Sequence, residues 1–304
     1  AVKYYNSLSK NLLTLEEQNI AFGSGYRYAN SGAIRNSGME FSVAAGVLRD
    51  RNGLDLTLFA KGVVNRSRIT ELPDYSAAAF NASNFENGNH YGMSEGDAAD
   101  GIYALRSAGI DPETGREQFY LRDGSVSFDP TAADMEYQGS MTPKLRGTFG
   151  ATAAYRNFDF AAVFSYSLGG KIYNYSELAM AGGYATNQYR YMLDAWHPVR
   201  NPDSDLPRAG TDDRLVPSSL QVHDASYLRL KNATVSYTFD LRKKTRLLRD
   251  ITLAVTGENL WLWTKYNGFD PDVSSEGTSS TLRRVDMGAY PRSRMFVFSI
   301  QLRY

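Results

Sequence analysis

The chain of 304 residues carries 33 Lys and Arg against 33 Asp and Glu, so no net charge would draw it to nucleic acid. It has no cysteine, and its three histidines, His90, His197 and His223, match no metal-ligand spacing, which excludes disulfides, thiolate chemistry and a histidine metal centre. It also lacks a Ser-His-Asp order, a nucleophile elbow and a phosphate-binding loop, so we expect neither an enzyme nor a cofactor.

Aromatic residues are abundant in a chain that is otherwise polar. There are 21 Tyr, 15 Phe and 3 Trp, whereas the mean hydropathy is −0.41. No stretch approaches the roughly 18 to 20 apolar residues that a membrane-spanning helix needs. A closed β-sheet can also cross a bilayer, and its strands look half polar because only alternate residues face lipid.

Alternation of apolar and polar residues with a period of two recurs along the chain and predicts β-strands. Residues 2–15 form a first, less regular strand. The second and third strands lie at residues 39–45 and 54–61. Two longer alternating segments follow at residues 144–155 and 158–168.

The C-terminal third contains three further strands, at residues 228–239, 251–256 and 296–304, which makes about eight in all. In the first of these, the alternation changes phase near Asn232, and this change predicts a β-bulge. The last strand alternates most regularly and has one apolar face, which we expect to contact lipid. That face consists of Phe296, Phe298, Ile300, Leu302 and Tyr304.

The connections between the strands alternate between short and long. The short ones cover residues 49–53, 156–158 and 241–249, and the first contains Asn-Gly, a preferred hairpin dipeptide. A soluble sandwich or propeller would also alternate, but it would have no reason to keep its long loops at one end. We therefore expect an antiparallel transmembrane β-barrel with short periplasmic turns and long extracellular loops. These loops are predicted at about residues 16–32, 69–140, 177–220 and 267–293.

One of the long loops contains the candidate substrate-binding residues. Flat aromatic side chains near the mouth of a barrel can stack on sugars or pack against a peptide. An equally good interpretation is the aromatic girdle that lines the membrane interface of such barrels. The four candidates are Tyr184, Tyr189, Tyr191 and Trp196.

Two other groups favour a structural interpretation. For Trp261, Trp263 and Tyr266 we favour the girdle or the barrel wall over substrate binding. The aspartates at positions 203, 205, 212 and 213 do not have the spacing of an EF-hand calcium loop, so we interpret them as part of a solvated loop.

A series of short motifs, taken in order, resembles the C-terminal half of SusC/RagA-type TonB-dependent transporters of the Bacteroidetes outer membrane. The most specific are SYLRLKN at 226–232 together with TKY at 264–266 and GFDPD at 268–272. Residues 73–110 and 177–220 match poorly. The other matching segments are 30–32, 36–40, 111–115, 142–144, 158–160, 169–173, 257–260 and 290–291.

The resemblance implies more than the periodicity does. Such transporters have a 22-stranded, plugged barrel, receive energy from TonB, pair with a SusD-like lid lipoprotein and import oligosaccharides or peptides. Residues 1–304 would then be the C-terminal portion of the barrel domain. Because the chain begins in strand-like residues without a signal peptide, we expect the plug, the TonB-contacting segment and the earlier strands to lie outside it.

The expected location is the outer membrane of a Gram-negative, Bacteroidetes-like cell, with the strands crossing the bilayer several times. The expected partners are the remaining barrel and plug, the lid lipoprotein, TonB, membrane lipid and a glycan or peptide, but no nucleic acid. The alternative is a passive porin or a small, autonomous structural barrel, because eight strands can close a barrel of their own.

Overall fold

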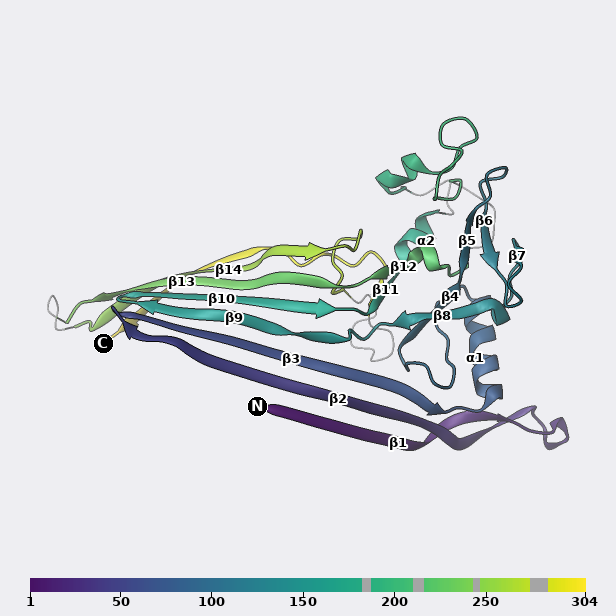
Figure 1. Cartoon of the computed structure of the whole chain (residues 1–304), viewed down its shortest axis with the longest axis horizontal. Coiled ribbons are helices and arrows are strands. Elements are labelled where there is room, and N and C mark those ends of the chain that lie inside the picture. Colours follow the sequence, from purple (N-terminus) through teal and green to yellow (C-terminus); the bar gives the residue numbers. More distant parts are fainter. Residues whose placement is uncertain (182–186, 210–215, 243–246, 274–283) are drawn as a thin grey trace.

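The computed structural model describes residues 1–181, 187–209, 216–242, 247–273 and 284–304. Its main feature is one sheet of eight antiparallel strands in which each strand pairs with its neighbours along the chain, in the order β1-β2-β3-β9-β10-β13-β14-β16 (Figure 1). The all-β antiparallel fold and the eight predicted strands are confirmed. The strands are β1 (Val2–Glu17), β2 (Tyr26–Arg51), β3 (Leu54–Glu71), β9 (Leu145–Tyr155), β10 (Phe158–Leu168), β13 (Tyr227–Asp240), β14 (Asp250–Thr264) and β16 (Met295–Arg303).

One face of the sheet is apolar because the strands pair in a register that aligns their apolar residues. Phe160 lies opposite Val235, Val235 opposite Val255, and Val255 opposite Phe298. These four side chains are between 43% and 77% exposed, so no protein core covers them. A row of exposed apolar side chains across four strands is what a lipid-facing barrel surface requires.

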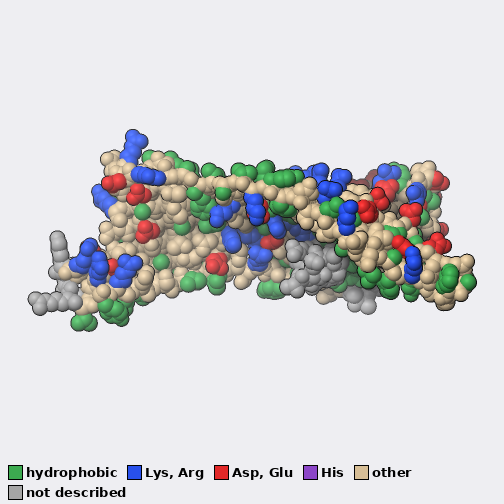
Figure 2. All heavy atoms as spheres, turned by 90° about the horizontal axis from the view of Figure 1, so that it is seen from below, with side chains coloured by type: hydrophobic (Ala, Val, Ile, Leu, Met, Phe, Trp, Pro, Cys, Tyr) green, Lys and Arg blue, Asp and Glu red, His purple; other side chains and the backbone are tan. Residues whose placement is uncertain are grey.

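The opposite face of the sheet is polar. The hydroxyl groups of Thr234 and Thr256 lie 2.9 Å apart across β13 and β14, and those of Thr238 and Thr252 lie 2.8 Å apart. In the view of Figure 2, hydrophobic side chains follow the long edges of the molecule, and Lys and Arg side chains gather near its middle and at the short-turn end. The apolar face therefore suits contact with lipid, and the polar face suits contact with water.

The predicted bulge in β13 is confirmed. Both neighbouring strands skip Lys231, because Leu230 and Asn232 are paired on each side but Lys231 is not. The extra residue brings Leu228 and Leu230 onto the same face as Ala233 and Val235, which the change of phase in the sequence required.

Short turns join the strands at one end of the sheet. Asn52 and Gly53 adopt φ values of +54° and +76° between β2 and β3, as an Asn-Gly hairpin turn needs. The opposite end carries the long connections and their small helices and sheets (Figure 1).

The predicted loop 16–32 is more ordered than the sequence pattern indicates. The strands β1 and β2 continue through most of residues 16–32, where Leu15 pairs with Tyr28 and Glu17 with Tyr26, so the connection is only residues 18–25. These strand ends have no buried face, because none of residues 13–17 and 26–31 is buried, and the apolar alternation there is too short to mark a strand by itself. Part of the predicted loop 267–293, residues 274–283, lies outside the described residues.

The connection between β3 and β9, predicted as the loop 69–140, is a folded unit. It contains α1 (Asp74–Glu86), β4 (Gly101–Leu105), β5 (Ser107–Ile110), β6 (Glu117–Tyr120), β7 (Val126–Ser127), the short 3₁₀ helix η2 (Ala132–Asp134) and β8 (Met135–Ser140). The connection between β10 and β13 contains β11 (Lys171–Asn174), α2 (Tyr175–Ala181), the 3₁₀ helices η3 (Arg190–Asp194) and η4 (Ser219–Gln221), and β12 (Val222–Asp224). The strand β15 (Val285–Asp286) precedes β16.

The hydrophobic core lies at this loop end and not within the eight-stranded sheet. Ile102, Met141, Tyr173 and Val285 form one cluster in which every side chain is at most 2% exposed, and it unites all three long connections after β3. Each connection is therefore held by burial against the others. No helix among the described residues is long and apolar enough to cross a membrane.

Candidate functional site

The loop after α2 brings two of the predicted aromatic residues together. The rings of Tyr189 and Tyr191 are stacked, with centroids 5.4 Å apart and an angle of 13° between their planes. Both hydroxyls lie close to α2: burial raises the pKa of Tyr189 and of Tyr191, and the nearby Ser176 and Glu177 also influence these pKa values. The helix α2 therefore lies beside both rings.

A pocket of about 590 Å³ opens beside these rings. Its lining combines the two aromatic rings with carboxylate, amide and guanidinium groups, the mixture that orients a polar ligand in a binding site. It is lined by Asn174, Glu177, Tyr189, Arg190, Tyr191, Leu193, Asp194, Asn267 and Gly268.

Glu177 is the most constrained side chain of this pocket. His223 Nε2 lies 2.6 Å from one carboxylate oxygen, and the Asn267 amide donates to the other at 3.1 Å. The Glu177 backbone N–H donates to Asn174 at 3.2 Å. Two distant segments of the chain thus hold the carboxylate, and Asn174 holds the backbone of the same residue. Burial, followed by the charge of Glu177, raises the pKa of Tyr191, so this hydroxyl stays protonated.

Asn267 reaches the pocket because a buried ion pair holds its segment in place. Arg229 of β13 contacts Asp270 at 2.6 Å, and the two side chains are only 4% and 3% exposed. Asp270 also accepts from the backbone N–H of Asp272 at 2.9 Å. On the other side of Asn267, the Tyr266 hydroxyl donates to Asp286 at 2.7 Å. The motifs at 226–232 and 264–272 therefore contact each other through the Arg229–Asp270 ion pair.

Of the other two predicted aromatic residues, Trp196 does not line the pocket. The Trp196 indole packs on Gly115, where a Cβ would overlap the ring, and Gly115 has a φ of +70°. Trp196 thus anchors its loop to the β5–β6 turn. Tyr184 lies outside the described residues. Substrate contact by Tyr184, Tyr189, Tyr191 and Trp196 stays a prediction.

Sequence reasoning missed Asn174, Glu177 and Asn267. Asn267 lies between the motifs at 264–266 and 268–272, and Asn174 follows the motif at 169–173, so proximity to these motifs was the available signal. Glu177 had no local signal, because its partners His223 and Asn267 are distant in sequence.

The residues of the second aromatic group, Trp261, Trp263 and Tyr266, lie in two different surroundings. Trp261 and Trp263 are 46% and 53% exposed and lie opposite Leu230 and Leu228 on the apolar face, as the favoured girdle interpretation requires. Tyr266 is 5% exposed and lies in the loop core, so it belongs to neither the girdle nor the wall.

No protein-family model matches the chain, but the relatives found by sequence comparison are all named TonB-dependent receptors. TonB-dependent receptor P3 of Formosa agariphila is 28% identical over 99% of this chain and 32% of its own length. TonB-dependent receptor SusC of Bacteroides thetaiotaomicron is 25% identical over 90% of this chain and 27% of its own length. This chain is therefore similar, over nearly its whole length, to TonB-dependent receptors of the SusC/RagA type. It spans about a third of the length of the receptor P3.

Solved structures of the RagAB peptide transporter have the same fold. The RagAB peptide importer in its open-open state matches 100% of this chain and 32% of its own, with a TM-score of 0.77 and 24% identity. Another structure of the RagAB peptide transporter matches with a TM-score of 0.75 and 23% identity. The eight-stranded sheet is therefore part of an antiparallel β-barrel of the outer membrane.

Proposed function

We propose that this chain forms part of the wall and the outer loops of a TonB-dependent importer of oligosaccharides or peptides. The combination of three features carries the proposal: the sheet has one apolar face and one polar face, and a polar-aromatic pocket lies at its loop end. An import channel needs all three features, because it must lie in lipid, pass a polar cargo and contact that cargo at its entrance.

Residues 1–304 are proposed as the C-terminal portion of the barrel domain. The strands β1 and β16 each have one neighbour in the sheet, so their outer edges have no partner strand among the described residues. Within the part of the chain that the structure describes, only Leu15 of β1 bonds elsewhere with its backbone N–H and C=O, to Ser76 of α1. Such edges must be paired in lipid. We therefore propose that strands from the remaining part of the protein continue the sheet at both edges and that a plug fills the barrel.

The loop end is proposed as the extracellular side, where a SusD-like lipoprotein would cover it and TonB would act from the opposite side. Support comes from the placement of the short turns at one end, which is typical of the periplasmic end of bacterial barrels (Figure 1). The Phe296–Tyr304 row would face lipid, together with the other residues of the apolar face.

The pocket at Tyr189 and Tyr191 is proposed as a cargo contact. A stacked aromatic pair offers a flat face to the C–H surface of a sugar or to a peptide side chain, and Glu177 with Asn267 offers hydrogen-bond acceptors and donors beside it. The chemistry is binding and gating without a covalent step; the relatives are named receptors and transporters, not enzymes.

A double variant of the full-length transporter, Tyr189→Ala with Tyr191→Ala, tests this contact. We expect cargo binding to weaken by at least roughly ten-fold, because aromatic stacking contributes about 1 kcal/mol or more per ring. The matched control is Tyr290→Ala, which removes a tyrosine that is 91% exposed. Unchanged binding in the double variant would show that the pocket is not the cargo contact.

Conductance separates an importer from a passive porin. The full-length protein in a planar bilayer should remain closed without energy input, because a plug fills the lumen of such importers. A steadily open, ion-conducting lumen would instead favour the porin and overturn the proposed import function.

A further inference from the structure

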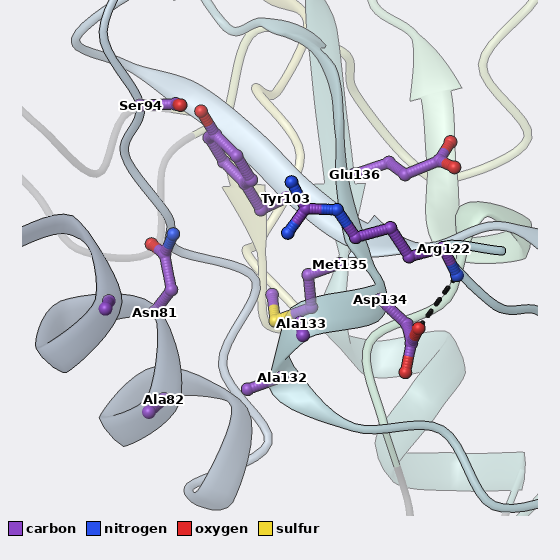
Figure 3. A pocket seen from close by; sticks show the side chains of 11 residues that line it. Asn81, Ala82, Ser94, Tyr103, Arg122, Ala132, Ala133, Asp134, Met135 and Glu136 are labelled. Carbon is purple, nitrogen blue, oxygen red and sulfur yellow. Dashed lines mark hydrogen bonds between the residues drawn. The ribbon is translucent and has the colours of Figure 1, made fainter. Parts of the chain in front are cut away.

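A second pocket lies in the folded unit between β3 and β9 (Figure 3), and it shares no lining residue with the pocket at Tyr189 and Tyr191. Its volume is about 550 Å³, within the range of small-molecule sites. The helix α1, the segment before β4, Arg122, η2 and the start of β8 form its walls. Nothing in the proposed import function assigns a role to it.

Small apolar side chains line much of this pocket. The helix α1 contributes two alanines and η2 contributes two more, with a methionine beside them, so there is room for an apolar group but no hydrogen-bond partner for a polar one. These five residues are Ala78, Ala82, Ala132, Ala133 and Met135.

Most polar groups of the pocket are already paired within the protein. The Asn81 amide donates to the Met93 carbonyl at 3.1 Å and accepts from the Met93 N–H at 2.8 Å. The Tyr103 hydroxyl donates to Asp97 at 2.6 Å. The amide oxygen and one amide N–H of Asn81 and the hydroxyl proton of Tyr103 are therefore already used within the protein.

The two carboxylates of the pocket are also engaged. Asp134 accepts from the Arg122 backbone N–H at 2.9 Å and from the backbone N–H and hydroxyl of Thr131 at 2.8 Å and 2.7 Å. Glu136 lies 4.0 Å from Arg106, and its carboxylate points away from the Arg122 guanidinium (Figure 3). Neither carboxylate forms a hydrogen bond or a direct ion pair with that guanidinium, so its N–H donors stay available, although the charge of Asp134 acts on it from nearby.

The Arg122 guanidinium is the exception. Within the described part of the chain it forms no hydrogen bond or ion pair, and it extends across the pocket toward Tyr103 (Figure 3). A guanidinium presents parallel N–H donors that match the two oxygens of a carboxylate. An unpaired guanidinium beside methyl groups favours a ligand with a carboxylate at one end and a short apolar group at the other.

We infer that this pocket binds a small aliphatic carboxylate, with its carboxylate on Arg122 and its apolar end on the alanines of α1 and η2. A phosphate or sulfate ion would match the charge but would leave the apolar surface uncovered. The amide of the same carbon skeleton would match the shape but not the charge.

The test measures butyrate binding to the detergent-solubilised full-length protein by saturation-transfer NMR or calorimetry, without any transport step. Butyramide and inorganic phosphate are the comparison probes. We expect butyrate to bind at least roughly ten-fold more tightly than either, because its interaction with the guanidinium is charge-assisted and its chain covers apolar surface.

Three variants complete the test. Arg122→Gln should reduce butyrate affinity by at least roughly ten-fold, and Ala82→Leu should do the same by filling the apolar part while it leaves the charge in place. Arg200→Gln, which removes an exposed arginine of another connection, should change nothing. Equal binding of butyrate and butyramide, or undiminished binding in Arg122→Gln, would overturn the inference.

Discussion

The buried pair of Arg229 and Asp270 determines where the segment after β14 lies. Its 2.6 Å contact has almost no exposure to solvent, whereas the Arg27–Glu16 contact at 2.9 Å is 62% and 27% exposed. Loss of one partner from a buried pair leaves an uncompensated charge in a low dielectric, but loss of an exposed partner leaves a charge in water.

Arg229→Met should therefore destabilise the loop end by about 3 to 5 kcal/mol, against less than about 1 kcal/mol for Arg27→Met. Amide hydrogen exchange of residues 264–273 in the full-length protein measures this difference. The double variant Arg229→Met with Asp270→Leu should recover much of the loss, since no charge remains buried. Equal protection of residues 264–273 in Arg229→Met and Arg27→Met would contradict this role.

His90 makes the loop end sensitive to acid. Its ring is 2% exposed and stacks on Tyr173 at 4.1 Å and near Tyr91 at 4.0 Å. Burial lowers the pKa of His90 to about 3, so the folded state holds it neutral while the unfolded chain protonates it below its ordinary value of 6.5. The stability from neutral His90 is complete above pH 6.5 and is lost as the pH falls toward 3.

We expect the free energy of unfolding of the loop end to fall by about 2 kcal/mol between pH 7.5 and pH 5 because of this residue. Chemical unfolding of the full-length protein, followed by tryptophan fluorescence at both pH values, measures the change. His90→Phe should remove a large part of the pH dependence. A pH dependence that stays the same in His90→Phe would show that other groups cause it.

The strand β16 shows how alternation determines the two faces of an element. Phe298 and Ile300 lie opposite Val255 and Leu253, whereas Ser299 lies opposite Ala254 on the polar face. Adjacent positions in this strand therefore face different surroundings, and matched substitutions can separate them.

Phe298→Arg should destabilise the full-length barrel by about 2 to 4 kcal/mol, because it places a charge in the hydrocarbon region, whereas Ser299→Arg should cost about 1 kcal/mol or less. The folded fraction in lipid vesicles at increasing urea concentrations measures both. Equal effects of the two variants would argue against a lipid-facing Phe296–Tyr304 row.

Sequence predicts the strands and the loop end unequally well, for a physical reason. Alternation is strong in β10 or β13 because their two faces lie in different surroundings, and even the bulge at Lys231 is visible as a change of phase. In β4 all five residues are buried, so nothing alternates, and Leu105 donates to the carbonyl of Pro217, far along the chain. The candidate pocket depends on such distant contacts at Glu177, so its tyrosines and the residues beside the motifs carry a local signal but Glu177 does not.

The whole molecule divides into a sheet whose apolar face has no protein cover and a loop end that contains the core. The two parts depend on each other through the motifs at 226–232 and 264–272, which leave the sheet and enter the core. Substitutions in these motifs should therefore change the stability of the loop end, whereas substitutions on the apolar face should change insertion into the membrane.

Sidedness tests the central claim most directly, and the absence of cysteine from this chain makes it measurable with single introduced thiols. In an otherwise cysteine-free full-length protein, Ser125→Cys lies at the loop end and Leu247→Cys, which replaces a side chain that is 79% exposed, lies in a short turn. A membrane-impermeant maleimide applied to intact cells should label Ser125→Cys and should reach Leu247→Cys only after the outer membrane is permeabilised. Labelling of Leu247→Cys in intact cells, or protection of Ser125→Cys, would contradict an outer-membrane barrel with its loop end outside.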